Sequence, residues 1–224
     1  ERRRTLPQLH ILHRRGKLGL GSAYKDGFAW GQAGHFDSLI EMDADGGHPP
    51  TALPALLAPL ADSADLVLGS RYVTGGSTPG WPLNRRLLST TSNALARRLL
   101  GLAIADVTSG FRGYRSELLY EIDYRTIASD GYAFQVEALW RATRAGARVV
   151  EVPIAFHDRV LGASKINRLE VVRAAGTLLR LRHDSWHPDR VHESWLTDAD
   201  GLVDVRLSQS STTWPRPLGF AATK

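Results

Sequence analysis

The chain of 224 residues is 43% hydrophobic and 23% charged, a composition typical of a globular protein and long enough for one α/β domain with its own core. It contains no cysteine, which excludes a disulfide framework and a thiolate zinc site. The net charge of +5 and the sequence pI near 9.8 favour anionic partners, although a merely basic surface explains the same charge.

Segments typical of strands and of helices alternate along the chain. Apolar runs predict strands at residues 9–12, 36–42, 65–69 and 148–156, and helical spacing or capping signals predict helices at 22–33, 49–60, 87–100, 134–145 and 164–181. In the helix at 87–100, Leu88, Leu95 and Leu99 recur at helical spacing and form the expected apolar face. This alternation predicts an α/β sandwich with a largely parallel sheet in residues 1–182. Residues 183–224 have weak periodicity and predict an irregular C-terminal extension.

No segment of the sequence is expected to span a membrane. The longest apolar stretch, residues 52–61, contains two prolines and falls well short of the ~20 residues that a spanning helix needs. The N-terminal Glu-Arg-Arg-Arg is not followed by an apolar core, so we do not interpret it as a secretory signal.

Two carboxylates follow the strand expected at residues 36–42. Asp43 and Asp45 are two residues apart, so on an extended segment their side chains point the same way. Mg²⁺ and Mn²⁺ are often held by such hard oxygen ligands together with substrate phosphates. An acidic turn that caps the next helix explains the same residues, and acid-x-acid triplets are common. A phosphatase of the haloacid-dehalogenase type also carries two such aspartates, but the later acidic cluster that it needs follows no clear strand here.

Three further polar segments are candidates for phosphate binding. Arg71 directly follows a buried strand, and its guanidinium can grip a phosphate through two hydrogen bonds. Residues 106–112 crowd two hydroxyls, a glycine and an arginine into one turn, and residues 159–165 form a basic loop ahead of a helix. Each segment taken alone is explained equally well or better as a solvated turn or loop.

Two other motifs do not carry a function. Gly19 and Gly21 open a helix as a dinucleotide fingerprint does, but Tyr24 occupies the third glycine position and is too large for close packing. The histidines near the C-terminus are separated by Pro188, and no His-Glu-x-x-His motif occurs, so we expect surface histidines.

The order of the motifs is more informative than any one of them. Gly-Leu-Gly-Ser-Ala-Tyr24, Met-Asp43-Ala-Asp45-x-x-His-Pro-Pro, Leu-Gly-Ser-Arg71-Tyr-Val-x-Gly-Gly, Trp81…Arg85…Ser89…Asn93, Asp106-x-Thr-Ser-Gly-Phe-Arg112, Gly131-Tyr-Ala-Phe-Gln135-Val-Glu137, Glu151-Val-Pro-Ile-x-Phe and Asp158-Arg159-x-x-Gly-x-Ser-Lys165 follow one another. Over residues 18–172 this series resembles the polyprenyl-phosphate (dolichyl-phosphate) mannose synthases, within the inverting glycosyltransferases of family 2. Glucosyl relatives share several of these motifs.

The resemblance implies a GT-A-type (Rossmann-like) fold and a role for each matching residue. Asp43 and Asp45 match the motif that holds Mg²⁺ or Mn²⁺ against the diphosphate of GDP-mannose. Arg71, Arg85 and Ser89 match acceptor-phosphate positions, with Asp45 and Arg71 the expected catalytic residues. The remaining matches are Arg159 and Lys165, in a loop that closes on the donor, and Gln135 and Glu137, near the sugar.

The resemblance also implies the reaction and its setting. Mannose would pass from GDP-mannose to a polyprenyl monophosphate with inversion, and the lipid phosphate needs no strong base because it is already an oxyanion. We expect a cytoplasmic protein in peripheral contact with the inner membrane face, with a membrane protein as a candidate partner and without a nucleic-acid partner.

Two departures leave an alternative open. Family members begin with two strands that hold the nucleoside, and neither is in the printed sequence, so we expect an N-terminally incomplete catalytic domain. Gly47 also replaces a glutamine or serine that often follows the second aspartate. The alternative is an inactive or partner-dependent homologue that binds lipid phosphate or a partner enzyme.

Overall fold

The computed structural model describes residues 6, 8–157, 168–184 and 186–188, and of residues 168–174 only the backbone. Helices and strands alternate through most of this range. Their order is α2 (Leu20–Ala33), β1 (Ser38–Glu41), η1 (Pro50–Ala52), α3 (Leu53–Asp62), β2 (Leu66–Ser70), α4 (Leu83–Leu100), β3 (Arg112–Arg115), α5 (Ser116–Glu121), η2 (Tyr124–Thr126), α6 (Tyr132–Arg144), β4 (Val149–Pro153) and α7 (Arg168–His183).

A four-stranded mixed sheet in the order β1-β3-β2-β4 forms the centre of the fold. Strand β2 pairs with β4 in parallel, whereas β3 lies antiparallel between β1 and β2. Strands β1, β2 and β4 therefore point the same way, and β3 runs against them. The prediction of a largely parallel sheet missed β3, because its first residue, Arg112, ends a segment that we interpreted as a polar turn and no strand was predicted at residues 113–115.

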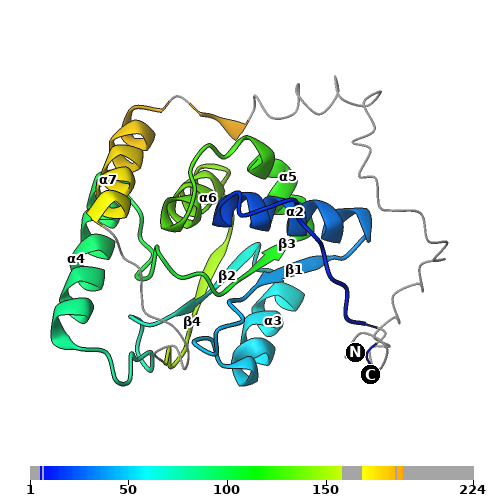
Figure 1. The fold of residues 1–224 in the computed structure, drawn as a ribbon, viewed down its shortest axis with the longest axis horizontal. Coiled ribbons are helices and arrows are strands. Elements are labelled where there is room, and N and C mark those ends of the chain that lie inside the picture. The colour runs from blue at the N-terminus through cyan, green and yellow to red at the C-terminus, as the bar shows by residue number, and fades with distance from the viewer. Residues whose placement is uncertain (1–5, 7, 158–167, 185, 189–224) are drawn as a thin grey trace.

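Helices cover both faces of the sheet (Figure 1). Leu66 and Leu68 of β2 pack into a large cluster with residues of α2, α5 and α6, whereas Val67 packs with Leu56 of α3 on the other face. Successive side chains of a strand point to opposite faces, so a strand buried on both sides has an uninterrupted apolar sequence. The contact with α3 is close at Gly113 of β3, since a Cβ there would lie 2.6 Å from Leu60 Cδ1 and would displace the end of that side chain.

Two sequence-based expectations were wrong. Residues 9–12 form no strand and are exposed in this structure, because no neighbouring strand pairs with them. Helix α4 begins at Leu83 and buries Asn93 and Ala96. Of the expected apolar face, Leu99 packs against the core, whereas Leu88 and Leu95 are exposed. Among the helices of the described residues, none is long and apolar enough to cross a membrane.

Candidate active site

Polar side chains gather at one edge of the sheet, where β1, β2 and β4 end and β3 begins. The pairing brings Glu41, the last residue of β1, opposite Arg112, the first residue of β3, and Leu68 of β2 opposite the same arginine. Ligands of α/β sheets usually bind at the carboxyl ends of the parallel strands. This edge is therefore where the functional residues are expected.

Asp43 and Asp45 lie on the loop that leaves β1 at this edge. Both are half-buried, whereas Met42, Ala44 and Gly46 are exposed, so the two carboxylates share the inner side of the loop. Residues 44–46 form a bend and Gly46 has a φ of 83°, so strand alternation is not what aligns the carboxylates. The backbone N–H of Gly47 donates to Asp45 Oδ1 at 2.9 Å and helps to fix the bend.

His48 holds the start of the same loop from inside. Its Nδ1 accepts a hydrogen bond of 3.1 Å from the backbone N–H of Asp43, and its ring packs on Phe111. Burial lowers the pKa of His48, which favours the neutral ring that this bond requires. The Tyr24 hydroxyl approaches the carboxylate from α2, with its oxygen 3.4 Å from Asp43 Oδ1.

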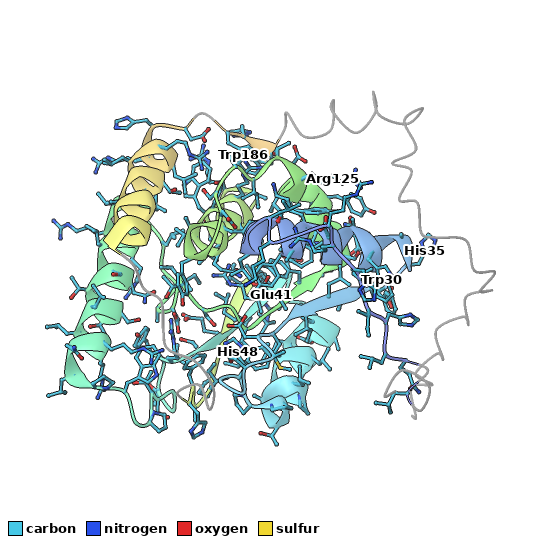
Figure 2. The ribbon with its side chains drawn as sticks, in the orientation of Figure 1. Trp30, His35, Glu41, His48, Arg125 and Trp186 are labelled. Atoms are coloured by element: carbon cyan, nitrogen blue, oxygen red, sulfur yellow. The ribbon has the colours of Figure 1, made fainter. Side chains whose placement is uncertain are left out.

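Glu41, the last residue of β1, is a buried carboxyl at this edge of the sheet (Figure 2). Its Oε1 accepts a weak bond of 3.4 Å from the Tyr114 hydroxyl, and Oε2 has no hydrogen-bond partner among the described residues. The Nε of Arg112 is 3.8 Å from Oε1, but it donates to Ser109 O at 2.7 Å instead. Burial consequently raises the pKa of Glu41 to about 8, against the opposing effect of Arg112.

Arg112 is completely buried, and its guanidinium binds backbone carbonyl groups and is not available for a phosphate. Its guanidinium donates to the carbonyl oxygens of Val107, Ser109 and Gln135. It thereby joins the 106–111 loop to α6. The arginine of the 106–112 segment is thus a structural residue of the site.

Arg71, at the end of β2, is held by Asp106. Its Nε and Nη2 donate to the two carboxylate oxygens at 2.7 and 2.6 Å, and its backbone N–H donates to Oδ2 at 3.0 Å. Burial acts to lower the pKa of Arg71, but the hydrogen bonds and charge of Asp106 raise it, so the guanidinium stays charged. Asp106 is itself oriented by Glu151 of β4, whose carboxylate accepts the backbone N–H groups of Ala105 and Asp106.

A pocket of about 220 Å³ lies beside Arg71. Its lining consists of Arg71, Tyr72, Gly76, Ser77, Thr78, Pro79 and Arg86. Ser89 lies behind it and accepts a hydrogen bond of 2.6 Å from the Tyr72 hydroxyl, whereas Arg85 stacks on Trp81 at 3.9 Å from the ring centre. Two guanidinium groups and three hydroxyl-bearing side chains around one small pocket can bind a phosphate.

An aromatic cluster connects this pocket with the aspartate loop. Phe156, which follows β4, lies 5.0 Å from the His48 ring and 5.6 Å from the Trp81 ring, measured between centroids. Its ring also lies 5.7 Å from the Arg71 guanidinium carbon. A Cβ on Gly47 would come within 2.9 Å of Phe156, so this packing leaves little room for a glutamine or serine there.

Gln135 and Glu137, the two residues expected near the sugar, point to different sides of α6. Gln135 faces the site and is buried, its two amide atoms form no hydrogen bond among the described residues, and a Cβ on Gly110 would lie 4.0 Å from its Nε2. Glu137 faces α7, where Ser129, Arg141 and Arg180 bind its carboxylate. Burial acts to raise the pKa of Glu137, but the bonds from Ser129 and Arg180 lower it. Arg159 and Lys165 lie outside the described residues.

Several residues of this edge escaped the sequence interpretation. Arg86 lines the pocket, but a helix start at residue 87 placed it outside the helix, where its direction could not be inferred. Asp106 and Glu151 appeared as parts of motifs without a partner, because their contacts join residues 35 and 45 positions apart. The burial of Glu41 could not be predicted from the sequence, since a charged residue at the end of a strand is usually solvated.

The donor set of the aspartate loop fits a divalent cation that also binds substrate. Two hard carboxylates share one side of the loop, and no group of three acidic or histidine side chains that could hold a metal occurs in the described part of the chain. Mg²⁺ and Mn²⁺ commonly take one or two protein carboxylates and complete their shell with phosphate oxygens and water. Asp43 and Asp45 are the residues that would hold such an ion.

Comparison with known proteins agrees with this arrangement. The chain is 49% identical over 160 residues to the polyprenol monophosphomannose synthase of Mycolicibacterium smegmatis, covering 71% of this chain and 60% of that protein. It is 48% identical to the undecaprenyl-phosphate mannosyltransferase of Micrococcus luteus, covering 72% and 66%. The chain thus spans between three fifths and two thirds of these relatives.

Solved structures of similar fold include glucosyl-3-phosphoglycerate synthase from Mycobacterium tuberculosis. One complex has a TM-score of 0.52 at 23% identity and covers 82% of this chain and 61% of that one. Another, with Mn²⁺, uridine diphosphate and phosphoglyceric acid, has a TM-score of 0.53 at 21% identity. This likeness confirms the predicted α/β fold of GT-A type.

The family itself is shown by the sequence. Residues 2–123, more than half of the chain, match the family model described as glycosyl transferase family 2. The motifs that align the chain with this family include the aspartate loop and Arg71, which the fold brings to one sheet edge. The chain therefore belongs to glycosyl transferase family 2.

Proposed function

We propose that this protein transfers mannose from GDP-mannose to a polyprenyl monophosphate, with inversion at the anomeric carbon and with Mg²⁺ or Mn²⁺. The observation that carries the proposal is that two candidate anion-binding sites lie at the same edge of the sheet. The aspartate loop suits a metal-bound diphosphate, and the pocket between Arg71 and Arg86 suits a phosphate. The names of the two similar proteins, one a polyprenol monophosphomannose synthase and one an undecaprenyl-phosphate mannosyltransferase, support the same pair of substrates.

Asp43 and Asp45 belong to the donor side. A bound divalent cation would neutralise the diphosphate and stabilise it as a leaving group. The protein's own part is to keep both carboxylates on the inner side of the loop, which His48 and the Gly47 backbone do. A solved relative of the same fold contains Mn²⁺ together with uridine diphosphate.

Arg71 and Arg86 belong to the acceptor side, with Arg85 and Ser89 in support. Asp106 occupies two N–H groups of Arg71 and so fixes the guanidinium in place. Ser89 fixes the Tyr72 hydroxyl at the pocket wall. A lipid phosphate bound there has its charge offset mainly by Arg86, because Asp106 already balances the charge of Arg71. This lowers its repulsion from the donor diphosphate.

The transfer itself needs few catalytic groups. An oxygen of the lipid phosphate attacks the anomeric carbon as the bond from that carbon to the diphosphate breaks, and GDP leaves with the bonding electrons. The attacking oxygen is already ionised at neutral pH, so no residue has to remove a proton. We assign Asp45 and Arg71 to the reacting centre and Gln135 to its sugar side.

A lipid acceptor places the reaction at a membrane surface. We propose that the protein acts on the cytoplasmic face of the inner membrane as a peripheral protein, where a membrane protein is a candidate partner. No nucleic-acid partner is proposed, because the arginines discussed above are committed to small-anion sites.

The test is a transfer assay with radiolabelled GDP-mannose and a polyprenyl phosphate in detergent, with Mn²⁺ present. Asp45→Ala should abolish transfer, and Arg86→Ala should raise the KM for the lipid phosphate at least tenfold while donor binding persists. Asp26→Ala, an exposed aspartate of α2, is the matched control for charge loss. Equal use of UDP-glucose would contradict the mannosyl assignment, and lipid-phosphate binding without transfer would favour the inactive or partner-dependent homologue.

A further inference from the structure

Gln135 of α6 has a buried amide that no other group of the described structure satisfies. The residue is 1% exposed, and neither Oε1 nor Nε2 forms a hydrogen bond with another described residue. Buried polar groups in folded proteins are nearly always hydrogen-bonded, and an unpaired one destabilises the fold. Burial raises the pKa of Glu41 and the Gln135 amide opposes this rise, so the two side chains are neighbours. A bond between them would use only part of the hydrogen-bonding capacity of the amide, and the rest is available to a ligand.

The amide faces a small space beside Gly110. A Cβ on Gly110 would lie 3.8 Å from the Tyr24 hydroxyl oxygen and 4.0 Å from Gln135 Nε2. The next neighbour is His48 Cε1, also at 4.0 Å. Side chains from α2, α6 and the aspartate loop thus surround the place that a side chain at position 110 would occupy, and the glycine leaves that place open.

Both walls of this space are held in position by the core. Arg112 donates to the carbonyl oxygens of Ser109 and Gln135 at 2.7 Å each, and so ties the 109–110 segment to α6. The Tyr24 hydroxyl oxygen lies 3.4 Å from Asp43 Oδ1, which places the space next to the aspartate loop. Polar groups that are already fixed in this way can bind a ligand without rearranging.

The chemistry around the space suits hydroxyl groups better than a phosphate. A primary amide offers N–H donors and a carbonyl acceptor, and a phenol offers one O–H group. Each hydroxyl of a sugar donates and accepts, so one amide can bind two adjacent hydroxyls at once. A phosphate would meet the Asp43 carboxylate here instead of the guanidinium groups that line the acceptor pocket.

We propose that Gly110 determines specificity for the donor sugar, because its missing side chain leaves room for hydroxyl groups that Gln135 and Tyr24 bind. This subsite rests on the proposed function and extends it from the diphosphate to the sugar of the donor. Because Asp43 belongs to the proposed diphosphate site, a sugar attached to that diphosphate lies next to the Tyr24 hydroxyl. A site built to hydrogen-bond hydroxyl groups rejects a ligand that leaves its polar groups unpaired.

The test compares the binding of GDP-mannose and of GDP, each with Mn²⁺ and without a lipid acceptor, by isothermal titration. Gly110→Ala puts a methyl group into the space with no contact outside its chain neighbours shorter than 3.8 Å, so the variant should melt at the wild-type temperature. It should weaken GDP-mannose relative to GDP about 25-fold, since one neutral hydrogen bond accounts for about a factor of five. Tyr24→Phe, which removes one hydroxyl, should change the same ratio about fivefold.

Gly27→Ala is the matched control, because it adds a methyl group to α2 where nothing lies within 4 Å, and it should leave both affinities unchanged. In the transfer assay, Gly110→Ala should raise the KM for GDP-mannose and leave the KM for polyprenyl phosphate as it is, a split that a general packing defect would not produce. An unchanged ratio in Gly110→Ala, or equal loss of both nucleotides, would overturn the subsite while wild-type transfer still supports the proposed function. Wild-type protein that binds neither nucleotide would refute the proposed function and the subsite with it.

Discussion

The buried carboxyl of Glu41 makes a prediction about stability that does not depend on catalysis. Its pKa is raised from 4.5 to about 8, chiefly by burial. Between these values the folded protein keeps a proton that the unfolded chain releases. The free energy of unfolding should therefore fall as the pH rises through this window. Glu41→Gln, which keeps the shape and removes the titration, should be more stable than wild type at neutral pH.

The size of the effect follows from the two pKa values. Each pH unit between them contributes about 1.4 kcal/mol. Wild type should thus lose about 3 kcal/mol relative to Glu41→Gln between roughly pH 5 and pH 7.5. The glutamine Oε1 can still accept the Tyr114 hydroxyl, and its amide nitrogen takes the place of Oε2. The cost of burying that nitrogen is the same at every pH, so it leaves the pH slope unchanged.

Urea unfolding of both proteins across this pH range is the measurement, with the exposed Glu117→Gln as control. The control should track wild type at every pH. The opposing hypothesis is that Arg112 keeps Glu41 ionised as a buried ion pair. In that case Glu41→Gln would be less stable than wild type, by a similar amount at each pH, and the argument from burial would be refuted.

Three further substitutions test the packing around the site. Asn93→Ala leaves the buried Val107 N–H without its acceptor and should cost about 2 kcal/mol in urea unfolding. Glu137, whose pKa is lowered in the folded state, stabilises the protein above its unfolded pKa and loses this effect as the pH falls. In Glu137→Gln, the free energy of unfolding should therefore fall less steeply than in wild type below about pH 4.5. The same slope in both proteins in this acidic range would contradict this. Gly19→Ala should lower the melting temperature, because Gly19 has a φ of 95° and a Cβ there would collide with Asp130.

Local chemistry was enough to predict much of the fold. The buried strand at β2 was visible because apolar residues occupy both of its faces, and the helix α6 ended as expected near Gly146. Asp43 and Asp45 follow a predicted strand, but an acidic pair there is also common in plain turns, so the pair gained its meaning from its place in the series of motifs. The ordered series of motifs then predicted the family, which the family model confirms.

Tertiary structure decided what each polar group does. Arg112 had the appearance of a phosphate ligand in a polar turn, yet three backbone carbonyls from distant segments occupy its guanidinium. Arg71 is set by Asp106, and Glu137 is turned away from the site by Arg180 of α7. Such partners come from separate strands and helices, so their identity depends on packing that no local pattern contains.

The same distinction explains α4. Its leucine spacing by itself determined that the segment is a helix with an apolar face, because periodicity is a local property of the chain. Which face is buried depends on what the helix packs against, and here Asn93 and Ala96 face inward. The hydrogen bonds of Asn93 to the 106–108 loop orient the helix. Leu99 and Leu100 pack partly buried against the core, whereas the other leucines of α4 are exposed. A buried amide with satisfied hydrogen bonds outweighed the apolar pattern, and only the folded structure supplies its partners.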